Sequence, residues 1–415
     1  MLVHRSRHNL AGTVLLVTAL AAAARAEGPA TTAVLRVGTS GDYRPFSFHD
    51  SSGALTGFDV TVAQRLGRDL GRPLELVVFR WPDLVHQLRT GGFDIAMSGV
   101  TVRADRAVDL AFSRPYAVTG AVAVIRTRDR RKFQNVDALD RSDTRIAVNA
   151  GGHLEQVARG RFAHARVGPV SNNARLPELL RQGEADAVIS EALEARGWPA
   201  AEFTVIGPFT RDRKAYAVSR SSAELLGQVN DWLAAREADG WLNQQRRRWF
   251  GAAATLTAQQ AGIEALVGAI DLRLQLIPSV AAVKRREHVP IADPAQEARV
   301  LERARAAATA AGLNADDVAA LFRVQMNAAK AVEQHAPDEP ARAGAALDDL
   351  RAALATVSSQ LIAELARCQR WLSDAGFERQ LDRAMHAVLT MPGLTSSEVN
   401  DLHTALRHVR TAPRP

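Results

Sequence analysis

Residues 185–196, ADAVISEALEAR in one-letter code, consist of an apolar strand that ends at Ser190 and a polar segment that carries Glu191 and Glu194. A second apolar strand ends at Ser98, and polar groups suited to an anion follow it as well. In open α/β folds, ligands bind at the carboxyl ends of such strands. A site that only holds an anion needs cations, but it does not need a second carboxylate one helical turn after the first. The extra acid therefore indicates a catalytic cleft.

Strand and helix patterns alternate around this stretch, from Ala33 to about Phe250. Such alternation is typical of mostly parallel sheets covered by helices. The strands are predicted at 34–39, 74–79, 94–98, 121–126, 145–149, 186–190 and 214–219, and the helices at 58–70, 82–91, 153–161, 176–182 and 222–249. We predict a two-lobed α/β domain at 33–250, with lobe 1 at about 33–124 and 218–250 and lobe 2 at about 125–217. The crossovers are expected near 125 and 217, and the ligand in the cleft between the lobes.

The composition changes after Gly251, and only helical patterns follow. Residues 251–260 are small and polar, which is typical of a linker. Apolar residues then recur at helical spacing from Ile263 to Ile277. Further helices are predicted to begin at Asp293-Pro294 and to occupy about 343–373 and 396–411. We predict an all-α domain at 261–415, and a coiled coil is less favoured because heptads are not sustained.

The first 26 residues have the pattern of a secretory signal peptide. Arg5 and Arg7 precede an apolar stretch from Leu10 to Ala23, and Ala24-Arg25-Ala26 fits a cleavage site. A membrane anchor is the alternative, but the stretch is too short to span comfortably. No later segment is expected to span. We therefore expect export, with cleavage near Ala26.

The overall composition narrows the possible partners. The formal net charge is +7, and removal of the predicted signal takes away three arginines and no acidic residue, which leaves +4. Basic runs are short, so nucleic acid is not an expected partner. A modest positive net charge is better suited to small anionic ligands. Cys368 is the single cysteine, so no disulfide can form within the chain, and the 11 histidines show no metal-ligand spacing. We expect neither a metal nor a cofactor.

Motifs in the first 250 residues resemble those of type II periplasmic solute-binding proteins. They are Val37 to Thr39, Asp42 to Phe46, Gly57 to Val60, Phe93 to Thr101 and Asp105-Arg106. A narrower resemblance is to the cyclohexadienyl dehydratases within that family. It depends on Gly41 to Tyr43, Trp81-Pro82, Asn149 to Gly152, Glu191 to Arg196 and Lys214 to Tyr216. The resemblance implies a periplasmic enzyme that acts on prephenate or on its amino analogue arogenate.

The implied dehydratase reaction explains the residue types in the cleft. Loss of carbon dioxide and of a ring hydroxyl aromatises prephenate, so the enzyme must hold two carboxylates and protonate the leaving hydroxyl. Glu194 matches the position of the general acid, which burial could keep protonated. Glu191 matches the partner of an ammonium group, and Lys214 would be a mobile cation. The remaining expected substrate contacts are Tyr43, Trp81, Ser98, Thr101, Arg106, Asn149, Gly152 and His153, of which His153 replaces the family's usual threonine.

The helical region resembles AroQ-type chorismate mutases, particularly the secreted class with a single-chain helical domain. The similar stretches are Leu266 to Leu274, Val280 to Lys284, Val289 to Pro294 with Glu297, and Phe322 to Glu333. Arg273 and Lys284 are 11 residues apart and therefore share one helix face. The implied rearrangement of chorismate to prephenate needs a pocket that holds a compact dianion and stabilises charge on the ether oxygen. The resemblance assigns that oxygen to Lys284 and Glu333, a carboxylate to Arg273, the ring hydroxyl to Glu297, and a further substrate contact to Asp293.

Three positions depart from the mutase pattern. Gln296 and Gln360 stand where members of the class often have arginines, and Ala329 replaces a small hydroxyl residue. Each lost partner could cost about 1–3 kcal/mol of binding free energy. Arg299 or Arg351 could compensate. The alternative is a degenerate helical module that only packs or dimerises.

Together the two resemblances imply an exported bifunctional enzyme of phenylalanine biosynthesis, in which one domain makes prephenate and the other consumes it. An amino-acid receptor with a helical interaction domain is the main alternative. A second alternative keeps the dehydratase and reduces the helical domain to an oligomerisation device. A homodimer through the helical domain is a further expectation, whereas the sequence leaves the preference between prephenate and arogenate open.

Overall fold

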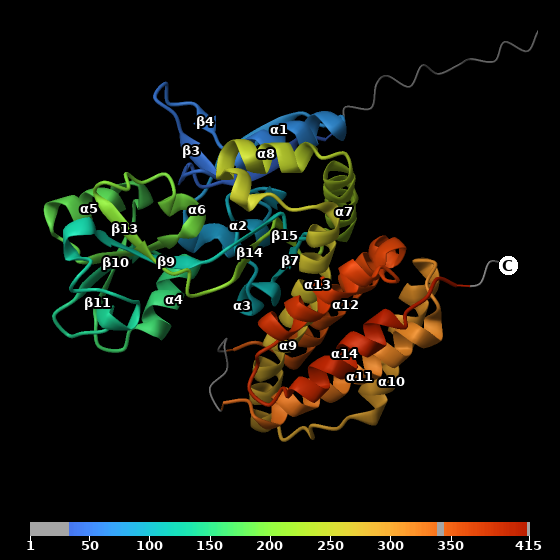
Figure 1. The fold of residues 1–415 in the computed structure, drawn as a ribbon. Coiled ribbons are helices and arrows are strands. Elements are labelled where there is room, and N and C mark those ends of the chain that lie inside the picture. Colours follow the sequence, from blue (N-terminus) through green and yellow to red (C-terminus); the bar gives the residue numbers. More distant parts are fainter. Residues whose placement is uncertain (1–32, 338–343, 413–415) are drawn as a thin grey trace, which may run out of the picture.

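The computed structural model describes residues 33–337 and 344–412, and the predicted signal peptide lies outside these ranges. Two α/β lobes are followed by a helical domain that packs beside the first lobe (Figure 1). This is the predicted fold class.

Lobe 1 is built on a five-stranded sheet with the order β5-β1-β6-β15-β7. Its strands are β1 (Leu35–Thr39), β5 (Leu74–Val78), β6 (Ile95–Ala96), β7 (Leu110–Phe112) and β15 (Ala217–Ser219). β1 is parallel to β5 and β6, whereas β15 returns antiparallel to β6 and β7. A small sheet of β2 (Asp42–Tyr43), β3 (Ser47–His49) and β4 (Leu55–Thr56) lies at its edge. The helices of this lobe are α1 (Phe58–Asp69), α2 (Leu84–Arg89), α3 (Ala104–Ala107), α7 (Ala223–Ala238) and α8 (Trp241–Phe250).

Lobe 2 repeats the plan with the order β11-β10-β12-β9-β13. Its strands are β9 (Ala121–Arg126), β10 (Arg145–Asn149), β11 (Arg166–Val170), β12 (Ala187–Glu191) and β13 (Phe203–Ile206). Its helices are α4 (His153–Arg161), α5 (Leu176–Gln182) and α6 (Ala192–Ala195). β10 is parallel to β11 and β12, so the ends of β10 and β12 point to the same edge. That edge carries Asn149 and Glu191 towards lobe 1.

The two crossovers form a ribbon of their own. β8 (Ala117–Thr119) pairs antiparallel with β14 (Asp212–Lys214). The chain therefore passes between the lobes several residues before the expected positions near 125 and 217, and β9 belongs to the sheet of lobe 2. The predicted strand at 214–219 is in fact the end of β14 and a separate strand, β15, because the chain enters a different sheet there. Apolar content alone does not reveal which sheet a strand joins.

The helical domain is arranged around one long central helix. Its helices are α9 (Ala258–Arg286), α10 (Pro294–Ala310), α11 (Ala315–Gln334), α12 (Leu347–Cys368), α13 (Ala375–Val388) and α14 (Ser396–Arg407). α9 begins with a capping box between Thr257 and Gln260 and packs against α11, α12 and α13. α13 was not among the predicted helices.

α9 is also long and apolar enough to cross a membrane by length and composition, contrary to the expectation that no segment after the signal has this character. However, 72% of its apolar window is buried inside the molecule. A helix that other helices surround is apolar on all sides, and this composition suits a central core helix.

The helical domain is joined to lobe 1 by a common core. Leu272 and Leu276 of α9 and Val357 of α12 belong to the same buried cluster as Phe112 and Leu226 of lobe 1. The two domains therefore share a hydrophobic interface and are not merely tethered by residues 251–257.

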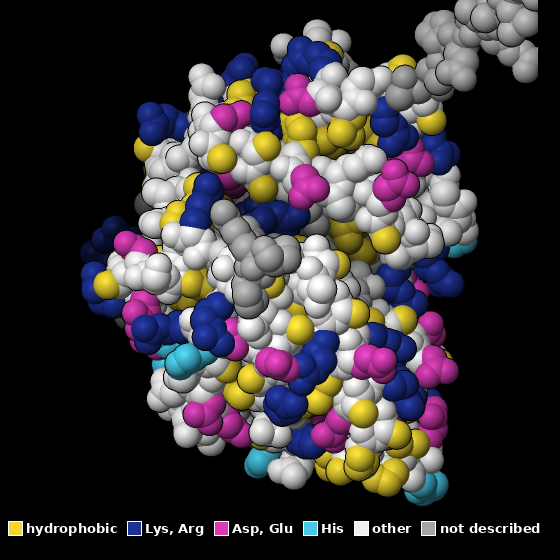
Figure 2. All heavy atoms as spheres, turned by 90° about the vertical axis from the view of Figure 1, so that its right-hand side faces the viewer, with side chains coloured by type: hydrophobic (Ala, Val, Ile, Leu, Met, Phe, Trp, Pro, Cys, Tyr) yellow, Lys and Arg dark blue, Asp and Glu magenta, His cyan; other side chains and the backbone are white. Residues whose placement is uncertain are grey.

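The molecular surface carries both charge signs. On the face shown in Figure 2, basic and acidic side chains are interspersed over lobe 1 and the helical domain. A nucleic-acid surface would instead gather basic residues on one face.

Candidate active sites

The first candidate site is a small cavity between the two lobes, close to the crossover ribbon. It measures about 20 Å³, which is room for about one water molecule. The predicted residues that line it are Tyr43, Trp81, Thr101, Arg106, Asn149, Gly152, His153, Glu191 and Lys214. The lobes are thus closed on each other, and a larger ligand would require them to open.

Several buried polar atoms around this cavity lack a hydrogen-bond partner among the described residues. They are Nε1 of Trp81, Nη1 of Arg106, Oδ1 of Asn173 and Oε2 of Glu191. An unpaired buried polar group costs free energy. These atoms are therefore well placed to bind the polar groups of a ligand.

Lys214 links the lobes inside the cavity. Its Nζ donates to Oγ1 of Thr101 in lobe 1, at 2.7 Å, and forms a short ion pair with Glu191 at the end of β12 in lobe 2. Lys214 is 1% exposed and Glu191 is 0% exposed. The same Nζ lies 5.7 Å from the centre of the Tyr43 ring. This cation is accordingly held between a carboxylate and an aromatic wall.

Glu194 lies one turn beyond Glu191, on α6, and is 7% exposed. Its carboxyl accepts hydrogen bonds from Nδ2 of Asn173 at 2.5 Å and from Oγ of Ser190 at 2.6 Å. Burial raises the pKa of Glu194 to about 8, against the opposing effect of these two hydrogen bonds. At neutral pH this side chain is therefore mostly a neutral acid, whereas Glu191 is paired with a cation.

Glu194 faces a larger outer chamber of about 890 Å³ rather than the inner cavity. Trp81, Asn149 and Asn173 line both spaces, and Asn173 bonds directly to Glu194. Glu194 thus lies next to the residues that separate the outer chamber from the inner cavity. Opening of the lobes would join the chamber and the cavity at this point.

Arg106 and His153 lie on opposite lobes. Burial, followed by the nearby charge of Arg103, lowers the pKa of Arg106 to about 9, and its Nη1 has no hydrogen-bond partner in the ranges 33–337 and 344–412. His153 begins α4, and its Nε2 lies 3.0 Å from Oδ2 of Asp212 on β14. Burial raises the pKa of Asp212, but the hydrogen bond and charge of His153 outweigh it, so the net shift is downward. His153 therefore contacts a carboxylate of the protein itself.

Ser98 does not line the cavity as expected. Its hydroxyl accepts from the backbone N–H of Ser40 at 3.0 Å and donates to Oγ of Ser40 at 2.9 Å, so it ties β6 to β1. Its neighbour Gly99 lines the cavity instead. Asn173 was not predicted, although the Asn172-Asn173 pair after β11 is a polar strand end like those at Ser98 and Ser190.

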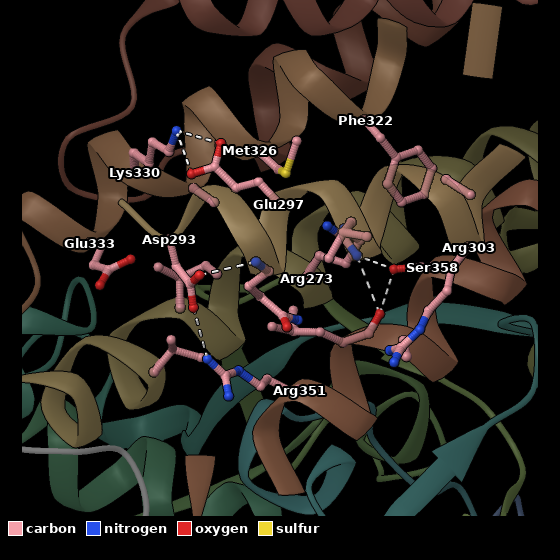
Figure 3. A pocket seen from close by; sticks show the side chains of 18 of the residues that line it. Arg273, Asp293, Glu297, Arg303, Phe322, Met326, Lys330, Glu333, Arg351 and Ser358 are labelled. Atoms are coloured by element: carbon pink, nitrogen blue, oxygen red, sulfur yellow. Dashed lines mark hydrogen bonds and ion pairs between the residues drawn. The ribbon is translucent and has the colours of Figure 1, made fainter. Parts of the chain in front are cut away.

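The second candidate site is a pocket of about 190 Å³ in the helical domain, between α9, α10, α11 and α12 (Figure 3). All the predicted residues of this site line it: Arg273, Lys284, Asp293, Glu297 and Glu333. α12 supplies the remaining wall from the same chain, with Arg351, Leu354 and Ser358.

Arg273 and Lys284 project from α9 into this pocket. Arg273 donates to the carbonyl of Leu354 at 3.2 Å and makes a short hydrogen bond with Ser358, and burial lowers its pKa to about 10. Nζ of Lys284 lies 3.1 Å from Oε1 of Glu333. Burial raises the pKa of Glu333 although Lys284 opposes the shift. This cation and this acid therefore share one end of the pocket.

The other two acids of the pocket are also paired with cations (Figure 3). Nζ of Lys330 lies 2.9 Å from Oε1 of Glu297, and Nη2 of Arg351 lies 3.3 Å from Oδ2 of Asp293. Arg303 lines the pocket as well and makes no ion pair with any described residue. The described residues thus give the pocket five cationic side chains, of which Arg303 and Lys330 were not predicted as site residues.

Two of the three departures from the expected pattern lie in this pocket, and one does not. Gln296 and Ala329 line it. Gln360 faces lobe 1, where its Nε2 donates to the carbonyl of Phe112 at 2.6 Å. The expectation that Gln360 weakens the pocket is wrong, because this side chain belongs to the domain interface. Of the two arginines expected to compensate, Arg351 lines the pocket, whereas Arg299 bonds to Gln296 and is exposed.

Residues 35–252 match the family of bacterial extracellular solute-binding proteins, family 3. The match covers more than half of the chain, and the protein belongs to this family. Residues 264–334 match the family chorismate mutase type II, and they extend from within α9 to the end of α11. The chain is therefore a fusion of the two families.

Individual relatives match the two-lobed domain. The cyclohexadienyl dehydratase of Pseudomonas aeruginosa is 34% identical over 222 residues, which cover 52% of this chain and 82% of that protein. The L-cystine-binding protein TcyJ of Escherichia coli K12 is 29% identical over 225 residues, which cover 53% and 84%. A solved ancestral amino-acid-binding protein, described as a precursor of cyclohexadienyl dehydratase, has 34% identity and a TM-score of 0.51, and the match covers 52% of this chain and 95% of that one.

Proposed function

We propose that the protein is an exported bifunctional enzyme of phenylalanine biosynthesis. The helical domain converts chorismate to prephenate, and the two-lobed domain converts prephenate to phenylpyruvate, arogenate to phenylalanine, or both. The observation that carries the dehydratase activity is the pair of glutamates: Glu194 is buried with a pKa of about 8, and Glu191 is paired with Lys214. A buried carboxyl group whose pKa is raised towards neutral pH is typical of a general acid.

In the dehydratase step, the neutral Glu194 donates its proton to the ring hydroxyl as the carbon–oxygen bond breaks. The electron pair of the breaking bond to the ring carboxylate moves into the ring, so carbon dioxide and water leave and phenylpyruvate remains. Each turnover consumes one proton, which solvent must return to Glu194. Lys214 and Arg106 would hold the carboxylates, and Trp81 and Tyr43 would flank the ring.

The closed cavity implies a cycle of opening and closing. At about 20 Å³ the space cannot hold prephenate, so substrate would enter through the outer chamber with the lobes apart. Opening would separate Lys214 from Glu191 of lobe 2, and closure around the substrate would exclude water from Glu194. Exclusion of water keeps the pKa of that carboxyl high and strengthens its hydrogen bond to the leaving hydroxyl.

In the mutase step, positioned charge is sufficient. Chorismate carries two carboxylates, and Arg273, Arg303 and Arg351 offer guanidinium groups from three different helices. Lys284, with Glu333 beside it, would stabilise the charge that develops on the ether oxygen. Arg303 and Arg351 would thereby replace the arginine that is lost at Gln296.

An amino-acid receptor is the second candidate function. The relatives include amino-acid-binding proteins, and the unpaired Oε2 of Glu191 could accept a hydrogen bond from an ammonium group. The same contact would suit arogenate. The buried neutral acid Glu194 has no evident purpose in a receptor, which favours the enzyme.

Export and assembly remain part of the proposal. The family description as extracellular supports export, with residues 1–26 as the signal and cleavage near Ala26. We also propose small-molecule substrates, domain limits at about 33–250 and 261–415, and a homodimer through the helical domain.

The experiment that tests the dehydratase is a comparison of turnover and binding. Signal-free protein is given prephenate or arogenate, and phenylpyruvate or phenylalanine is measured. The same protein is titrated with the common amino acids in a calorimeter. Turnover of either substrate without tight amino-acid binding supports the enzyme, whereas tight binding of an amino acid without turnover establishes the receptor.

A further inference from the structure

We propose that Arg213 is a positioning residue of the dehydratase cleft and that α9 of the helical domain holds it in place. The helical domain would then be a structural part of the neighbouring domain's active site, in addition to carrying its own. This inference depends on the proposed dehydratase function, because the residue that Arg213 positions is Lys214.

The first observation is the place of Arg213 on the crossover ribbon. β14 contains Asp212, Arg213 and Lys214, and side chains alternate between the two sides of a strand. Asp212 contacts His153 of lobe 2, and Lys214 contacts Thr101 and Glu191 in the cleft. Arg213 lies between two cleft residues and points away from them.

The second observation is that one face of α9 binds the side chain of Arg213. Nε of Arg213 lies 3.3 Å from Oε2 of Glu264, and its Nη1 lies 2.9 Å from Oδ2 of Asp271. Gly268 stands between these acids on the same helix face. A Cβ at this position would lie 2.9 Å from Cδ and 3.0 Å from Nε of Arg213. Glycine thus leaves the space in which the arginine side chain lies.

The third observation is that the ion pairs of Arg213 are buried and that neighbouring contacts hold β14 as well. Arg213, Glu264 and Asp271 are all buried, and Glu264 also pairs with Arg211, just before β14. The backbone carbonyl of Arg213 accepts from the N–H of Val102 in lobe 1 at 2.9 Å. Breaking a buried ion pair leaves an uncompensated charge, so the position of β14 is strongly constrained.

These contacts fix the strand from which Lys214 projects. In a two-lobed domain the crossover strands absorb the change when the lobes open and close. Because α9 anchors β14, this strand would stay with lobe 1 when the lobes open and close. Nζ of Lys214 would then remain next to Thr101. Substrate would therefore meet a cation that is already in place, and less of the binding free energy would be spent on ordering it.

The experiment uses the full chain and three variants. The double variant Glu264→Gln/Asp271→Asn removes both charges that hold Arg213. Gly268→Ala is the second test, because alanine favours the helix but its Cβ would displace the Arg213 side chain. Asp231→Asn is the matched control, since Asp231 pairs with Arg367 across the same domain interface, at 2.6 Å, and its side chain is exposed.

Two quantities are measured for each protein. The first is kcat/KM for prephenate and, as an internal control, for chorismate. The second is the distance between spin labels on lobe 1 and lobe 2, at Ser51→Cys and Ser142→Cys, which are both exposed. Cys368 is buried, and burial raises the pKa of its thiol to about 12, so it does not compete for the label.

We expect kcat/KM for prephenate to fall at least tenfold in the double variant and in Gly268→Ala, and the distance distribution between the lobes to broaden. Turnover of chorismate and the behaviour of Asp231→Asn should stay like the parent protein. Unchanged prephenate kinetics or an unchanged distance distribution in Gly268→Ala would overturn the inference. If the parent protein converts neither prephenate nor arogenate, the proposed function fails, and the distances still decide whether α9 restrains the crossover.

Discussion

The inter-lobe cleft and the helical pocket each contain a buried acid that is paired with a cation, Glu191 with Lys214 and Glu333 with Lys284. They differ in Glu194, a buried acid of the cleft that makes no ion pair with any described residue. In the cleft, a carboxyl is neutralised by burial, and several polar atoms around the cavity have no partner among the described residues. In the helical pocket, Asp293, Glu297 and Glu333 are each paired with a cation. A reaction that transfers a proton requires a shifted pKa, whereas a rearrangement without proton transfer requires only fixed charges.

The two sites also differ in how much room they offer to a substrate. The inner cavity of the cleft measures about 20 Å³ and must open for a substrate, whereas the helical pocket already offers about 190 Å³ between its helices. The two sites should therefore respond differently to changes in charge, in pH and in the hinge.

The largest expected effect comes from removal of the acidic proton of Glu194, which should affect the cleft but not the helical pocket. Glu194→Gln keeps the shape of the side chain but removes its proton. We expect kcat for prephenate to fall by about 10²–10⁴-fold, which is the usual contribution of a general acid. Turnover of chorismate should not change. Retention of dehydratase activity within a few fold would show that the proton comes from another group.

The converse variant is Lys284→Ala in the helical pocket. Loss of the cation next to Glu333 should lower kcat/KM for chorismate by about 10²–10³-fold, as for other groups that stabilise a developing charge. Prephenate turnover is the internal control and should be preserved. A small effect on chorismate would mean that the helical domain is a packing module, as the degenerate alternative holds.

The buried neutral Glu194 of the cleft should also make the stability of the protein depend on pH. The folded-state pKa of Glu194 is about 8, above its ordinary value of 4.5, so the folded chain binds more protons than the unfolded chain between these pH values. The free energy of unfolding should therefore fall, by a few kcal/mol as an order of magnitude, as pH rises from about 4.5 to 8. Denaturant unfolding of Glu194→Gln should lack this part of the slope. Parallel pH profiles for the two proteins would contradict the raised pKa.

A smaller effect is expected from Arg303, which lines the helical pocket and makes no ion pair within the described part of the chain. Arg303→Ala should raise KM for chorismate about tenfold, since a hydrogen bond to a charged group contributes about 1.5–3 kcal/mol. Arg299→Ala is the matched control from the same helix, because Arg299 is exposed and bonds to Gln296. Equal effects of the two substitutions would remove Arg303 from the site.

The smallest effect concerns the two glutamines that replace expected arginines. Gln296→Arg adds a cation to the pocket and should lower KM for chorismate by a few fold. Gln360→Arg should bring no gain in chorismate turnover, because position 360 faces the carbonyl of Phe112 in lobe 1. An improvement from Gln360→Arg would show that this side chain reaches the pocket.

Local patterns predicted much of the fold. The strands at 121–126 and 145–149 and the helices at 153–161 and 176–182 have the predicted bounds. The strands are short, nearly continuous buried runs, and the helices bury residues at helical spacing. The partner of a strand depends on distant residues, so the sheet of β9 and the split at Lys214 were not predicted. The contact between Gln360 and Phe112 depends on how the two domains dock, which no local pattern encodes.

The candidate site residues were predicted with similar limits. Residue type and spacing placed Glu191 and Glu194 at the end of a strand that faces the cleft, whereas Lys214 was added by the family resemblance. The turn of Ser98 towards Ser40, the presence of Asn173 and the arrival of Arg303 in the helical pocket depend on side-chain packing. The raised pKa of Glu194 likewise comes from burial by several elements, which the sequence only suggests.

The most direct test of the account is to supply signal-free protein with chorismate alone and to follow phenylpyruvate by its absorbance in alkali. We expect that phenylpyruvate forms and that either Glu194→Gln or Lys284→Ala abolishes its formation, with prephenate accumulating in the former variant. If phenylpyruvate forms neither from chorismate nor from added prephenate, the cleft is not a dehydratase site and the account is wrong.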